Sequence, residues 1–398
     1  MKTILQINTV LNKGSVGRIV QGIGEVLQDN GWESYIAYAR YGRSDNFRLI
    51  KIGNQVGVYS HVLGTRLTDR HGLYSTKATL NLIKQISSIN PDVIHIHNLH
   101  GYYINYRVLF QYLSKINIPI VWTLHDCWPF TGHCVYFDTC RCDKWKVCCK
   151  DCPQINTYPK AFIDRAEQNF LDKKKAFTLP DKILFVPVSE WLNELLKESF
   201  LKKYPSVVIR NGINIESFIP NPNLHFNEQE GKFIILGVAN VWEKRKGFLD
   251  FIKLAHFLSD DFVIILIGLN KKQMRKCPPN IIGISHTESI SELASYYNRA
   301  DVFLNLTYED NYPTTNLESI VCGTPVITYN TGGSPESIFP NNGYVVDKGD
   351  INAVLRCIDK IRNGEMEEKS VLINYAKNHF NQNICFREYL KIYENLIG

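Results

Sequence analysis

The stretch "YEDNYPTTNLESIV", residues 308–321, combines two carboxylates with the start signal of a helix. Pro313 is well placed to open a helix, because the N–H group that it lacks would be unpaired there in any case. Asp310 and Glu318 flank this position with seven residues between them. Carboxylates suit the hydroxyl groups of a ribose or a sugar. The helix start would supply free backbone amides for phosphate oxygens, namely those of Thr314, Thr315 and Asn316.

Two further segments could face phosphates. "NVWEKRKG" presents Lys244, Arg245 and Lys246 just before a glycine and a helix, and cations there could neutralise a diphosphate. A solvated helix start is the alternative. In "NKGSVGR", Gly14 and Gly17 let the backbone approach a ligand closely, although the full G-x-G-x-x-G is missing and a simple tight turn is equally compatible.

Polar residues also follow two strands expected in the first half of the chain. His97, Asn98 and His100 come after "DVIHI", and His125 and Asp126 come after "PIVWTL". In open α/β sheets ligands bind beyond the carboxyl ends of the strands. A histidine at a strand end is commonly structural, but several polar strand ends together favour a cleft.

Seven of the 11 cysteines lie between Cys127 and Cys152. Paired disulfides are not expected in a cytoplasmic chain, and tetrahedral zinc favours four thiolates with at least one close pair. Free or redox-active thiols and an iron–sulfur cluster are the alternatives. The segment is interpreted as a brace at the mouth of this cleft, with four candidate zinc ligands: Cys134, Cys142, Cys149 and Cys152.

The elements that must position these residues alternate between short β-branched runs and helix-period segments, which is the pattern of a parallel α/β sheet. Apolar residues between the first two strands share one helical face, with Gly31 at its stop. Ten strands are expected from the runs "TILQIN", "SYIAYA", "DVIHIH", "PIVWTL", "ILFVPV", "FIILGVA", "FVIILI", "DVFLNL", "PVITY" and "GYVV".

At 398 residues the chain is too long for one core, which stops growing at roughly 250–300 residues. Two doubly wound domains are expected, at residues 1–210 and 211–380, with a joint near 210–230 and a cysteine-rich insertion at 127–152. The closing segment, residues 381–398, could cross back to the first domain or simply end the second.

The hydrophobic fraction of 44% is that of a globular protein, and no apolar run reaches the roughly 18 residues of a membrane span. The opening residues lack the apolar core of a signal peptide, so a cytoplasmic location is expected. Nothing resembles a nucleic-acid-binding motif.

The net charge is +6, and basic residues cluster near Lys144 and Lys173. Such clusters are typical of solvated faces, or of attraction to an anionic membrane surface or substrate.

In combination these motifs resemble a known family. The run from Asp310 to Pro325, with "TGGSPESI" after it, resembles the E-x7-E, C-G-T-P and G-G-x-x-E motifs of retaining glycosyltransferases of family 4. That family has the GT-B fold, in which two Rossmann-like domains face a cleft. The resemblance covers nearly the whole chain, because further motifs follow in the family's order: "NKGSVG", "TLHDCWPFTGHC", "VSEWL", "RNGIN" and "KRKG".

The resemblance implies a role for individual residues. Glu318 would hold the ribose, Asp310 would contact the transferred sugar, and Lys246 would bind the diphosphate. His125 would lie near the donor sugar. Other candidate donor-binding residues are Gly14, Ser15, Asn240, Arg245, Glu309, Tyr312, Thr314, Thr315 and Asn316; candidate acceptor-side residues are His97, His100, Tyr102 and Trp128.

Two departures from the family pattern stand out. Asn240 occupies the position of the usual arginine six residues before Lys246, so Arg245 or another cation would compensate. Asp310 replaces the usual glutamate beside Glu309, which leaves open which carboxylate reaches the sugar.

The expected function is therefore retaining transfer of a hexose or N-acetylhexosamine from a nucleotide-diphosphate-sugar to a saccharide acceptor. The acceptor would be lipid-linked, and the product a bacterial surface polysaccharide. No cofactor is required for catalysis, and zinc would be structural. The location would be the cytoplasm or the inner face of the membrane. The alternatives are a GT-B nucleotide-sugar epimerase, a zinc-braced binding protein without catalysis, and a glycosidase that uses Asp310 and Glu318.

Overall fold

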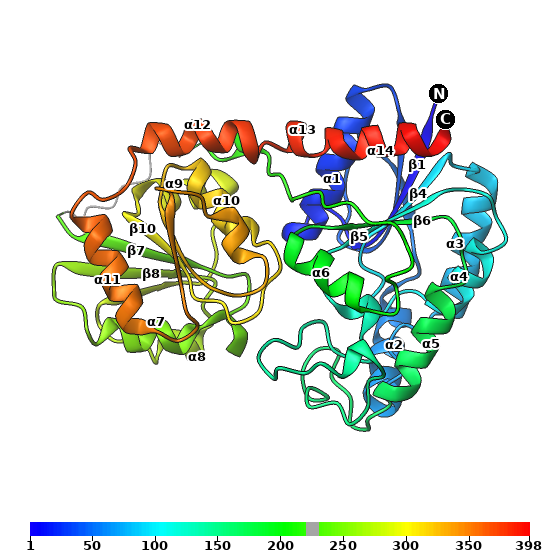
Figure 1. Ribbon diagram of the computed structural model, residues 1–398, viewed down its shortest axis with the longest axis horizontal. Helices are drawn as coiled ribbons and strands as arrows, with labels where there is room; N and C mark the ends of the chain where they lie inside the picture. The colour runs from blue at the N-terminus through cyan, green and yellow to red at the C-terminus, as the bar shows by residue number, and fades with distance from the viewer. Residues whose placement is uncertain (220–230) are drawn as a thin grey trace. The chain divides into compact units, whose positions relative to one another are not determined.

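The chain folds into two compact units in the computed structural model, which describes residues 1–219 and 231–398 (Figure 1). The first unit contains Met1–Arg210 and Phe386–Gly398, and the second contains Asn211–Cys385. The end of the chain thus belongs to the first unit.

The expected joint at residues 210–230 starts where the first unit ends, and its part from 220 to 230 lies outside the described residues. The break between the units near the end of the chain falls at Phe386. It separates a short helix, α13 (Gln382–Cys385), from the final helix, α14 (Arg387–Ile397).

The first unit is built on a six-stranded parallel sheet with flanking helices. The strands are β1 (Thr3–Val10), β2 (Glu33–Arg40), β3 (Arg48–Lys51), β4 (Val93–Ile96), β5 (Ile120–Leu124) and β6 (Ile183–Pro187). The helices are α1 (Gly14–Asp29), α2 (Gln55–Thr68), α3 (Thr76–Ile89), α4 (Tyr106–Leu113), α5 (Ala166–Phe177) and α6 (Glu190–Glu198), joined by α14.

The strand order is β3-β2-β1-β4-β5-β6. The chain moves outward from β1 to β3 and then returns to the other side of β1, so the direction of winding reverses between β1 and β4. Open α/β sheets bind ligands at such a switch point, beyond the carboxyl ends of the strands. The loops after β1, β4 and β5 are therefore the ones to inspect in this unit.

The central strands β4 and β5 are buried along their whole length, because a parallel sheet is covered on both faces. Every residue of β4 ("VIHI") and β5 ("IVWTL") is buried. In α1 the expected apolar face is confirmed, since Ile19, Ile23 and Leu27 are buried. The helix ends at Asp29, and Gly31 follows with a φ of 80°, as its position at the helix stop predicted.

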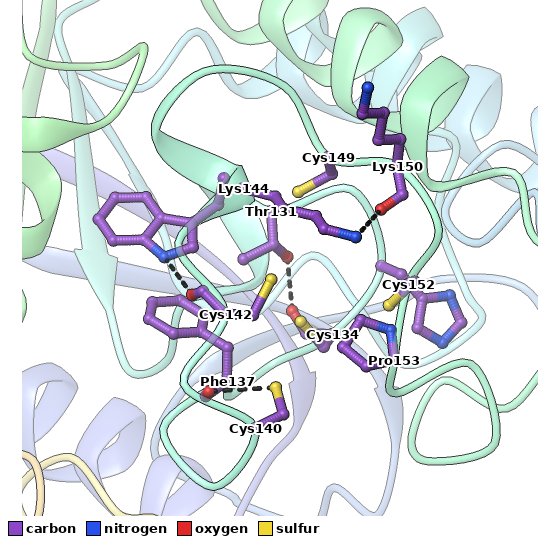
Figure 2. Close-up of a pocket in the computed structure, with 12 residues that line it drawn as sticks. Thr131, Cys134, Phe137, Cys140, Cys142, Lys144, Cys149, Lys150, Cys152 and Pro153 are labelled. Atoms are coloured by element: carbon purple, nitrogen blue, oxygen red, sulfur yellow. Dashed lines mark hydrogen bonds between the residues drawn. The ribbon is translucent and has the colours of Figure 1, made fainter.

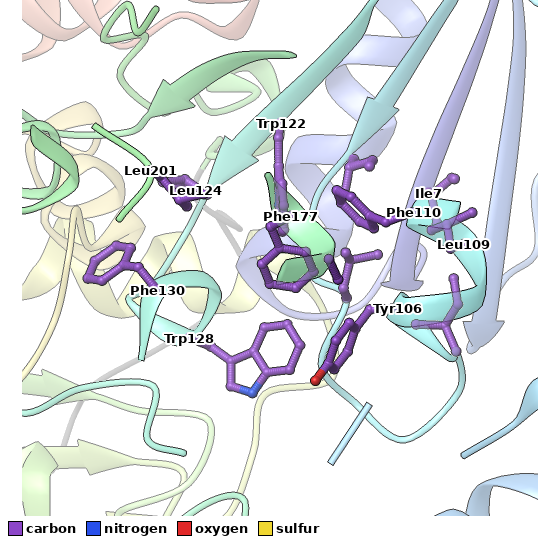
Figure 3. Packing of buried hydrophobic residues seen from close by; sticks show 14 of the residues in the cluster. Ile7, Tyr106, Leu109, Phe110, Trp122, Leu124, Trp128, Phe130, Phe177 and Leu201 are labelled. Atoms are coloured by element: carbon purple, nitrogen blue, oxygen red, sulfur yellow. The ribbon is translucent and has the colours of Figure 1, made fainter. Parts of the chain in front are cut away.

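Aromatic side chains fill the core on one face of the first sheet (Figure 3). Trp122 of β5 lies against Phe110 of α4 and Phe177 of α5, with ring centroids 5.3 and 4.9 Å apart. Tyr106 contacts Phe177 at 5.1 Å. These contacts fix the end of β5, and thereby the start of the loop that carries His125.

The opposite face of the sheet holds the C-terminal helix, because side chains alternate along a strand and Thr123 points away from Trp122. The hydroxyl groups of Thr123 and Tyr389 are 2.9 Å apart. The hydroxyl group of Tyr393 lies 2.7 Å from Nδ1 of His95. The structure therefore places α14 on β4 and β5 in the first unit.

The second unit repeats the architecture. Its strands are β7 (Phe233–Val238), β8 (Phe262–Ile267), β9 (Ile281–Ile284), β10 (Val302–Asn305), β11 (Val326–Tyr329) and β12 (Gly343–Val346). Its helices are α7 (Phe248–Ala255), α8 (Lys271–Met274), α9 (Ile290–Arg299), α10 (Thr314–Val321), α11 (Ile351–Arg362), α12 (Lys369–His379) and α13.

The strand order β12-β11-β10-β7-β8-β9 puts the switch point of the second sheet between β7 and β10. All ten predicted strands are present. The sequence did not predict β3 and β9, which lie at the edges of their sheets and are only partly buried. Within the described parts of the chain, no helix has the length and apolar character that crossing a bilayer requires.

Candidate functional site

Lys246 and Asp310 meet at the switch point of the second sheet. Lys246 ends the 3-10 turn Lys244–Lys246 in the loop after β7, and Asp310 lies in the loop after β10. The Lys246 Nζ atom is 2.6 Å from Oδ2 of Asp310, and both side chains are largely buried. The neighbouring strands thus bring a cation and a carboxylate together where α/β sheets bind ligands.

Backbone contacts hold these two loops in place. The Tyr308 amide donates to the Arg245 carbonyl (2.7 Å), and the Arg245 guanidinium donates to the Glu309 carbonyl (2.9 Å). Gly247 has a φ of 74°, and a Cβ atom there would lie 2.1 Å from the Leu306 carbonyl oxygen. Only glycine allows so close an approach of the two loops.

The electrostatics of the pair follow from its burial. Burial disfavours the ionised carboxylate, yet Lys246 and Arg245 hold the pKa of Asp310 below its usual value of 3.8. Burial lowers the pKa of Lys246 below 10.5, and Asp310 opposes that shift. The carboxylate is therefore ionised at neutral pH, where it stabilises the buried ammonium group.

Glu318 lies in the second turn of α10 and is buried. The Tyr297 hydroxyl group donates to its Oε2 atom over 3.1 Å. Sequence reasoning missed Tyr297, which orients the carboxylate from α9. The helix begins at Thr314, so Pro313 is its N-cap residue and not its first helical residue.

Asn316 does not fit the role predicted for it. Its amide donates to the Pro313 carbonyl (3.2 Å), so it is not free for a phosphate oxygen. Its side chain is fully buried and bonds to Asn305, Ser334 and Ser337. Asn316 thus ties the start of α10 to the loop after β11. The amides of Thr314 and Thr315 stay predicted phosphate ligands.

The other candidate donor-binding residues of this unit differ in exposure. Asn240 is exposed at the end of β7, whereas Glu309 is only 6% exposed and Tyr312 only 4%. The Tyr312 carbonyl accepts from the Asn211 side chain (3.1 Å). Tyr312 is thus buried beside the site, and Asn240 lies in the same loop as Lys246.

In the first unit, Gly14 and Ser15 are exposed at the start of α1, just after the loop that follows β1. Gly14 has a φ of 66°, and a Cβ atom there would have no other atom within 4 Å. The open space in front of Gly14 would let a ligand approach the backbone. Thr9 of β1 links this strand end to the loop after β4, since its hydroxyl group bonds to the His100 carbonyl (2.5 Å).

Three histidines form a buried row at the ends of β4 and β5. His97 Nδ1 lies 3.2 Å from His125 Nε2, and its Nε2 lies 3.1 Å from the Gln6 side chain. The His95 ring packs against the His97 ring, with centroids 4.0 Å apart and planes tilted by 39°. Burial lowers the pKa of His125 to about 4, so its ring is neutral at pH 7. His97 is 1% exposed, so it positions His125 and does not reach an acceptor as predicted.

A second cluster lies beside this row and reaches the surface. His100 Nε2 is 2.7 Å from Asp126 Oδ2, and His100 Nδ1 is 3.0 Å from the Tyr158 hydroxyl group. Burial opposes ionisation of Asp126, but the neighbouring His100 holds its pKa below the usual range. Tyr102 lies 5.8 Å from Tyr158, ring to ring. The cluster offers hydrogen-bonding groups and aromatic faces for a saccharide.

Sequence reasoning named His100, Tyr102 and Asp126 but missed Tyr158 as a partner of His100. Asp126 directly follows the predicted catalytic residue His125, and the two were predicted together at the end of the strand. Tyr158 lies 32 residues further along the chain, and no local pattern links it to the site.

Trp128 was predicted to stack on the acceptor, but it is only 1% exposed. Its ring packs against Tyr106, with centroids 6.0 Å apart, in the aromatic core of Figure 3. The Lys173 ammonium group lies 3.6 Å from the ring centre and donates to the carbonyls of Trp128 and Thr131. Burial lowers the pKa of Lys173 to about 7. Trp128 and Lys173 therefore anchor the loop that follows His125.

The four predicted zinc ligands, Cys134, Cys142, Cys149 and Cys152, line one small pocket (Figure 2). A hydrogen bond from Cys134 lowers the pKa of Cys152 to about 7, and burial raises that of Cys149 to about 12. Among the described residues, no group of three or more histidine, cysteine or acidic side chains is arranged to hold a metal ion. Zinc therefore stays a prediction from the sequence.

Two lysines of the cysteine-rich segment, Lys144 and Lys146, bond to neighbouring groups of the first unit. Lys144 donates to the carbonyls of Lys150 (2.9 Å) and Asp151 (3.1 Å), as Figure 2 shows for the first. Lys146 pairs with Glu198. These lysines hold the segment together and to α6.

Comparison with known proteins agrees with this geometry. Residues 16–217, just over half of the chain, match the family described as Glycosyltransferase Family 4, and residues 222–379 match Glycosyl transferases group 1. The colanic acid biosynthesis glycosyl transferase WcaC of Escherichia coli is 24% identical over 99% of this chain and its own full length. The N,N'-diacetylbacillosaminyl-diphospho-undecaprenol alpha-1,3-N-acetylgalactosaminyltransferase of Campylobacter jejuni is 24% identical over 54% of this chain and 60% of its own.

Solved structures share the fold at low sequence identity. Sucrose-phosphate synthase of Thermosynechococcus elongatus has a TM-score of 0.73 at 16% identity, over 100% of this chain and 99% of its own. HepE of Anabaena, in complex with UDP-glucose, has a TM-score of 0.69 at 12% identity, over 99% of this chain and 100% of its own. With two matched domains, two parallel sheets and a polar switch point in each, the chain belongs to glycosyltransferase family 4 and is a glycosyltransferase of the GT-B fold.

Proposed function

We propose that this glycosyltransferase moves a hexose or N-acetylhexosamine, with retention, from a nucleotide-diphosphate-sugar to a lipid-linked saccharide acceptor during assembly of a surface polysaccharide. The observation that carries the proposal is the Lys246–Asp310 pair at the switch point, with the Glu318 carboxylate on the adjoining helix. Relatives named for colanic acid biosynthesis and for a diphospho-undecaprenol acceptor support the product and acceptor classes.

In this proposal Lys246 and Arg245 bind the donor diphosphate. Breaking the bond between the anomeric carbon and the phosphate places negative charge on the leaving group, and fixed cations stabilise that charge. Lys246 is held by Asp310 and Arg245 by the Glu309 carbonyl, so both cations are positioned before the reaction. Glu318, oriented by Tyr297, accepts hydrogen bonds from the ribose hydroxyl groups.

Retention needs no protein nucleophile when the leaving phosphate removes the proton of the acceptor hydroxyl group on the same face of the sugar. The buried His125 is neutral at pH 7, because its pKa is about 4. A neutral ring has one donor and one acceptor nitrogen, so it can form a hydrogen bond with a sugar hydroxyl group. His100, Tyr102 and Tyr158 form the acceptor side of the first unit. We place the enzyme at the inner face of the cell membrane.

The test is binding followed by transfer. The unfolding midpoint is measured with UDP, GDP, CMP and their sugar conjugates, because a ligand that binds the folded state raises it. One nucleotide diphosphate family should raise it. Glu318→Ala should lose most of this shift and all sugar transfer, whereas Glu365→Ala, which removes an exposed carboxylate of the same unit, should behave like the parent.

Near-normal transfer by folded Glu318→Ala would refute the site. Conversion of the donor to an epimer without any acceptor would instead identify a nucleotide-sugar epimerase. A folded protein whose midpoint moves with none of these nucleotides would contradict the transferase proposal.

A further inference from the structure

The outer face of α2 is apolar. Four large side chains project from it into solvent: Val56, Tyr59, Leu63 and Leu67, which are 75%, 72%, 59% and 54% exposed. Their spacing of three, four and four residues puts them on one stripe of the helix. Single exposed apolar residues are common on proteins, but a continuous stripe over three turns marks an interaction surface.

The helix that carries this stripe is firmly held. Its N-cap residue, Asn54, accepts from the Gly57 amide (2.8 Å). On its inner face His61 is buried, with Nδ1 2.8 Å from the Ser75 hydroxyl group and Nε2 accepting from the Gly72 amide (3.1 Å). The stripe is thus presented by a rigid element of the first unit.

Two further apolar side chains extend the surface. Phe162 and Ile163 are 66% and 53% exposed, in the loop that leads to α5. The Phe162 amide donates to the Arg66 carbonyl (2.8 Å), which fixes this loop at the C-terminal end of α2. In Figure 1, α2 and α5 lie at the same end of the first unit. The four residues of the α2 stripe together with Phe162 and Ile163 are called the apolar surface below.

The charge on the α2 side of the apolar surface is positive, whereas Asp164 and Glu167, near Phe162 and Ile163, are exposed carboxylates. Residues 51–90, which contain α2 and α3, include one acidic residue, Asp69, and it is fully buried. Near Phe162, the carboxylate of Asp164 accepts from the Ala166 amide (2.8 Å) and also bonds to the Cys152 amide. Four basic side chains of α2, α3 and the turn between them are exposed: Arg66, Arg70, Lys77 and Lys84.

We propose that the apolar surface docks the first unit onto an anionic lipid bilayer. The stripe would enter the interface between headgroups and acyl chains, and the basic residues would contact anionic headgroups. A convex apolar helix suits a bilayer, which needs no matching groove. A second copy of this chain would bring the same basic residues face to face, and such like-charge contacts are costly.

This inference rests on the proposed function only in that a lipid-linked acceptor lies in a membrane. It also moves the membrane contact away from the basic run at Lys144–Lys150, in which Lys144 bonds within the segment and Lys146 pairs with Glu198.

The test uses the full chain and sedimentation with vesicles of phosphatidylcholine, with or without 30% phosphatidylglycerol. The parent should bind the anionic vesicles at least ~10-fold more tightly than the neutral ones, and added salt should weaken this binding. Leu63→Gln with Leu67→Gln should reduce binding at least ~10-fold, because both lost side chains would be inserted in the bilayer. The control Leu249→Gln with Phe257→Gln removes side chains that are 60% and 65% exposed in the second unit. This control should bind both kinds of vesicle as the parent does.

Equal vesicle binding by the parent and the Leu63/Leu67 variant would overturn the inference. A parent that does not bind anionic vesicles would overturn it as well. A parent dimer that this variant converts to a monomer, without loss of vesicle binding, would assign the surface to a second copy instead. The nucleotide-induced rise in unfolding midpoint is measured on the same samples. If it persists while vesicle binding fails, only the docking surface is wrong; if it is absent while vesicle binding persists, only the proposed function is wrong.

Discussion

Removing the carboxylate of Asp69 should loosen the cysteine-rich segment and the loop after β5. Asp69 follows α2, is fully buried, and has a φ of 51°. Its Oδ1 atom lies 2.6 Å from His133 Nδ1, and its Oδ2 atom accepts from the Arg165 amide (3.0 Å). One carboxylate thus joins α2, the cysteine-rich segment and the start of α5.

The expected cost follows from what is left unpaired. Asp69→Ala leaves the His133 ring and the Arg165 amide without an acceptor, at ~1–3 kcal/mol for each buried group. Breaking a buried charge-assisted pair by removing one partner costs about 3–5 kcal/mol. In a unit of this size that lowers the unfolding midpoint by about 6–20 °C. Asp69→Asn retains the size, an oxygen for His133 and tolerance of the positive φ, so it should cost about 1–3 kcal/mol.

Calorimetry would measure this effect, and the reaction of buried Cys134 and Cys149 with a thiol reagent would detect local opening. If opening is confined to the cysteine-rich segment, the reaction should accelerate by roughly 100-fold or more in Asp69→Ala, since 1.4 kcal/mol is a factor of ten. An alanine variant with parent-like stability and parent-like thiol reactivity would refute the reasoning.

Two further predictions concern charge and metal. Lys246 and Arg245 keep the pKa of Asp310 below 3.8 in the folded protein, so its stabilising effect is present above that pH and is lost as the pH falls through the lower folded value. The unfolding midpoint should therefore fall more steeply below about pH 4 in the parent than in Asp310→Asn, and equal slopes would contradict the assignment. If the cysteines bind zinc, protein purified without added metal should contain about one equivalent, and Cys149→Ser should lose it. Metal-free protein with full activity would exclude zinc.

The strands and their type could be predicted from the sequence, because a central parallel strand needs a nearly continuous apolar run. β5 and β8 show such runs and are buried along their whole length. The edge strands β3 and β9 were not recognised, because they are only partly buried and are not held to a continuous apolar run. Strand ends could also be predicted, and with them Lys246, Asp310 and His125, which lie in the loops that follow strands.

What the sequence could not determine was which side chains point into the site and which point into the core. Trp128 and His97 lie at strand ends like His125 and His100, yet they are buried by partners distant in the chain: Lys173 covers Trp128, and Gln6 binds His97. The exposure of the α2 stripe could not be predicted either, because its apolar residues look like those of a helix that packs against the core.

The sequence by itself thus determined two doubly wound units and the loops that carry the polar residues, since hydrophobic periodicity and strand order follow from local pattern. Only the tertiary structure decided the partners: Asp310 for Lys246, Tyr297 for Glu318, and solvent instead of a neighbouring helix for Leu63. The physical reason is that burial and hydrogen bonding depend on which elements pack together, and residues far apart in the chain supply those neighbours.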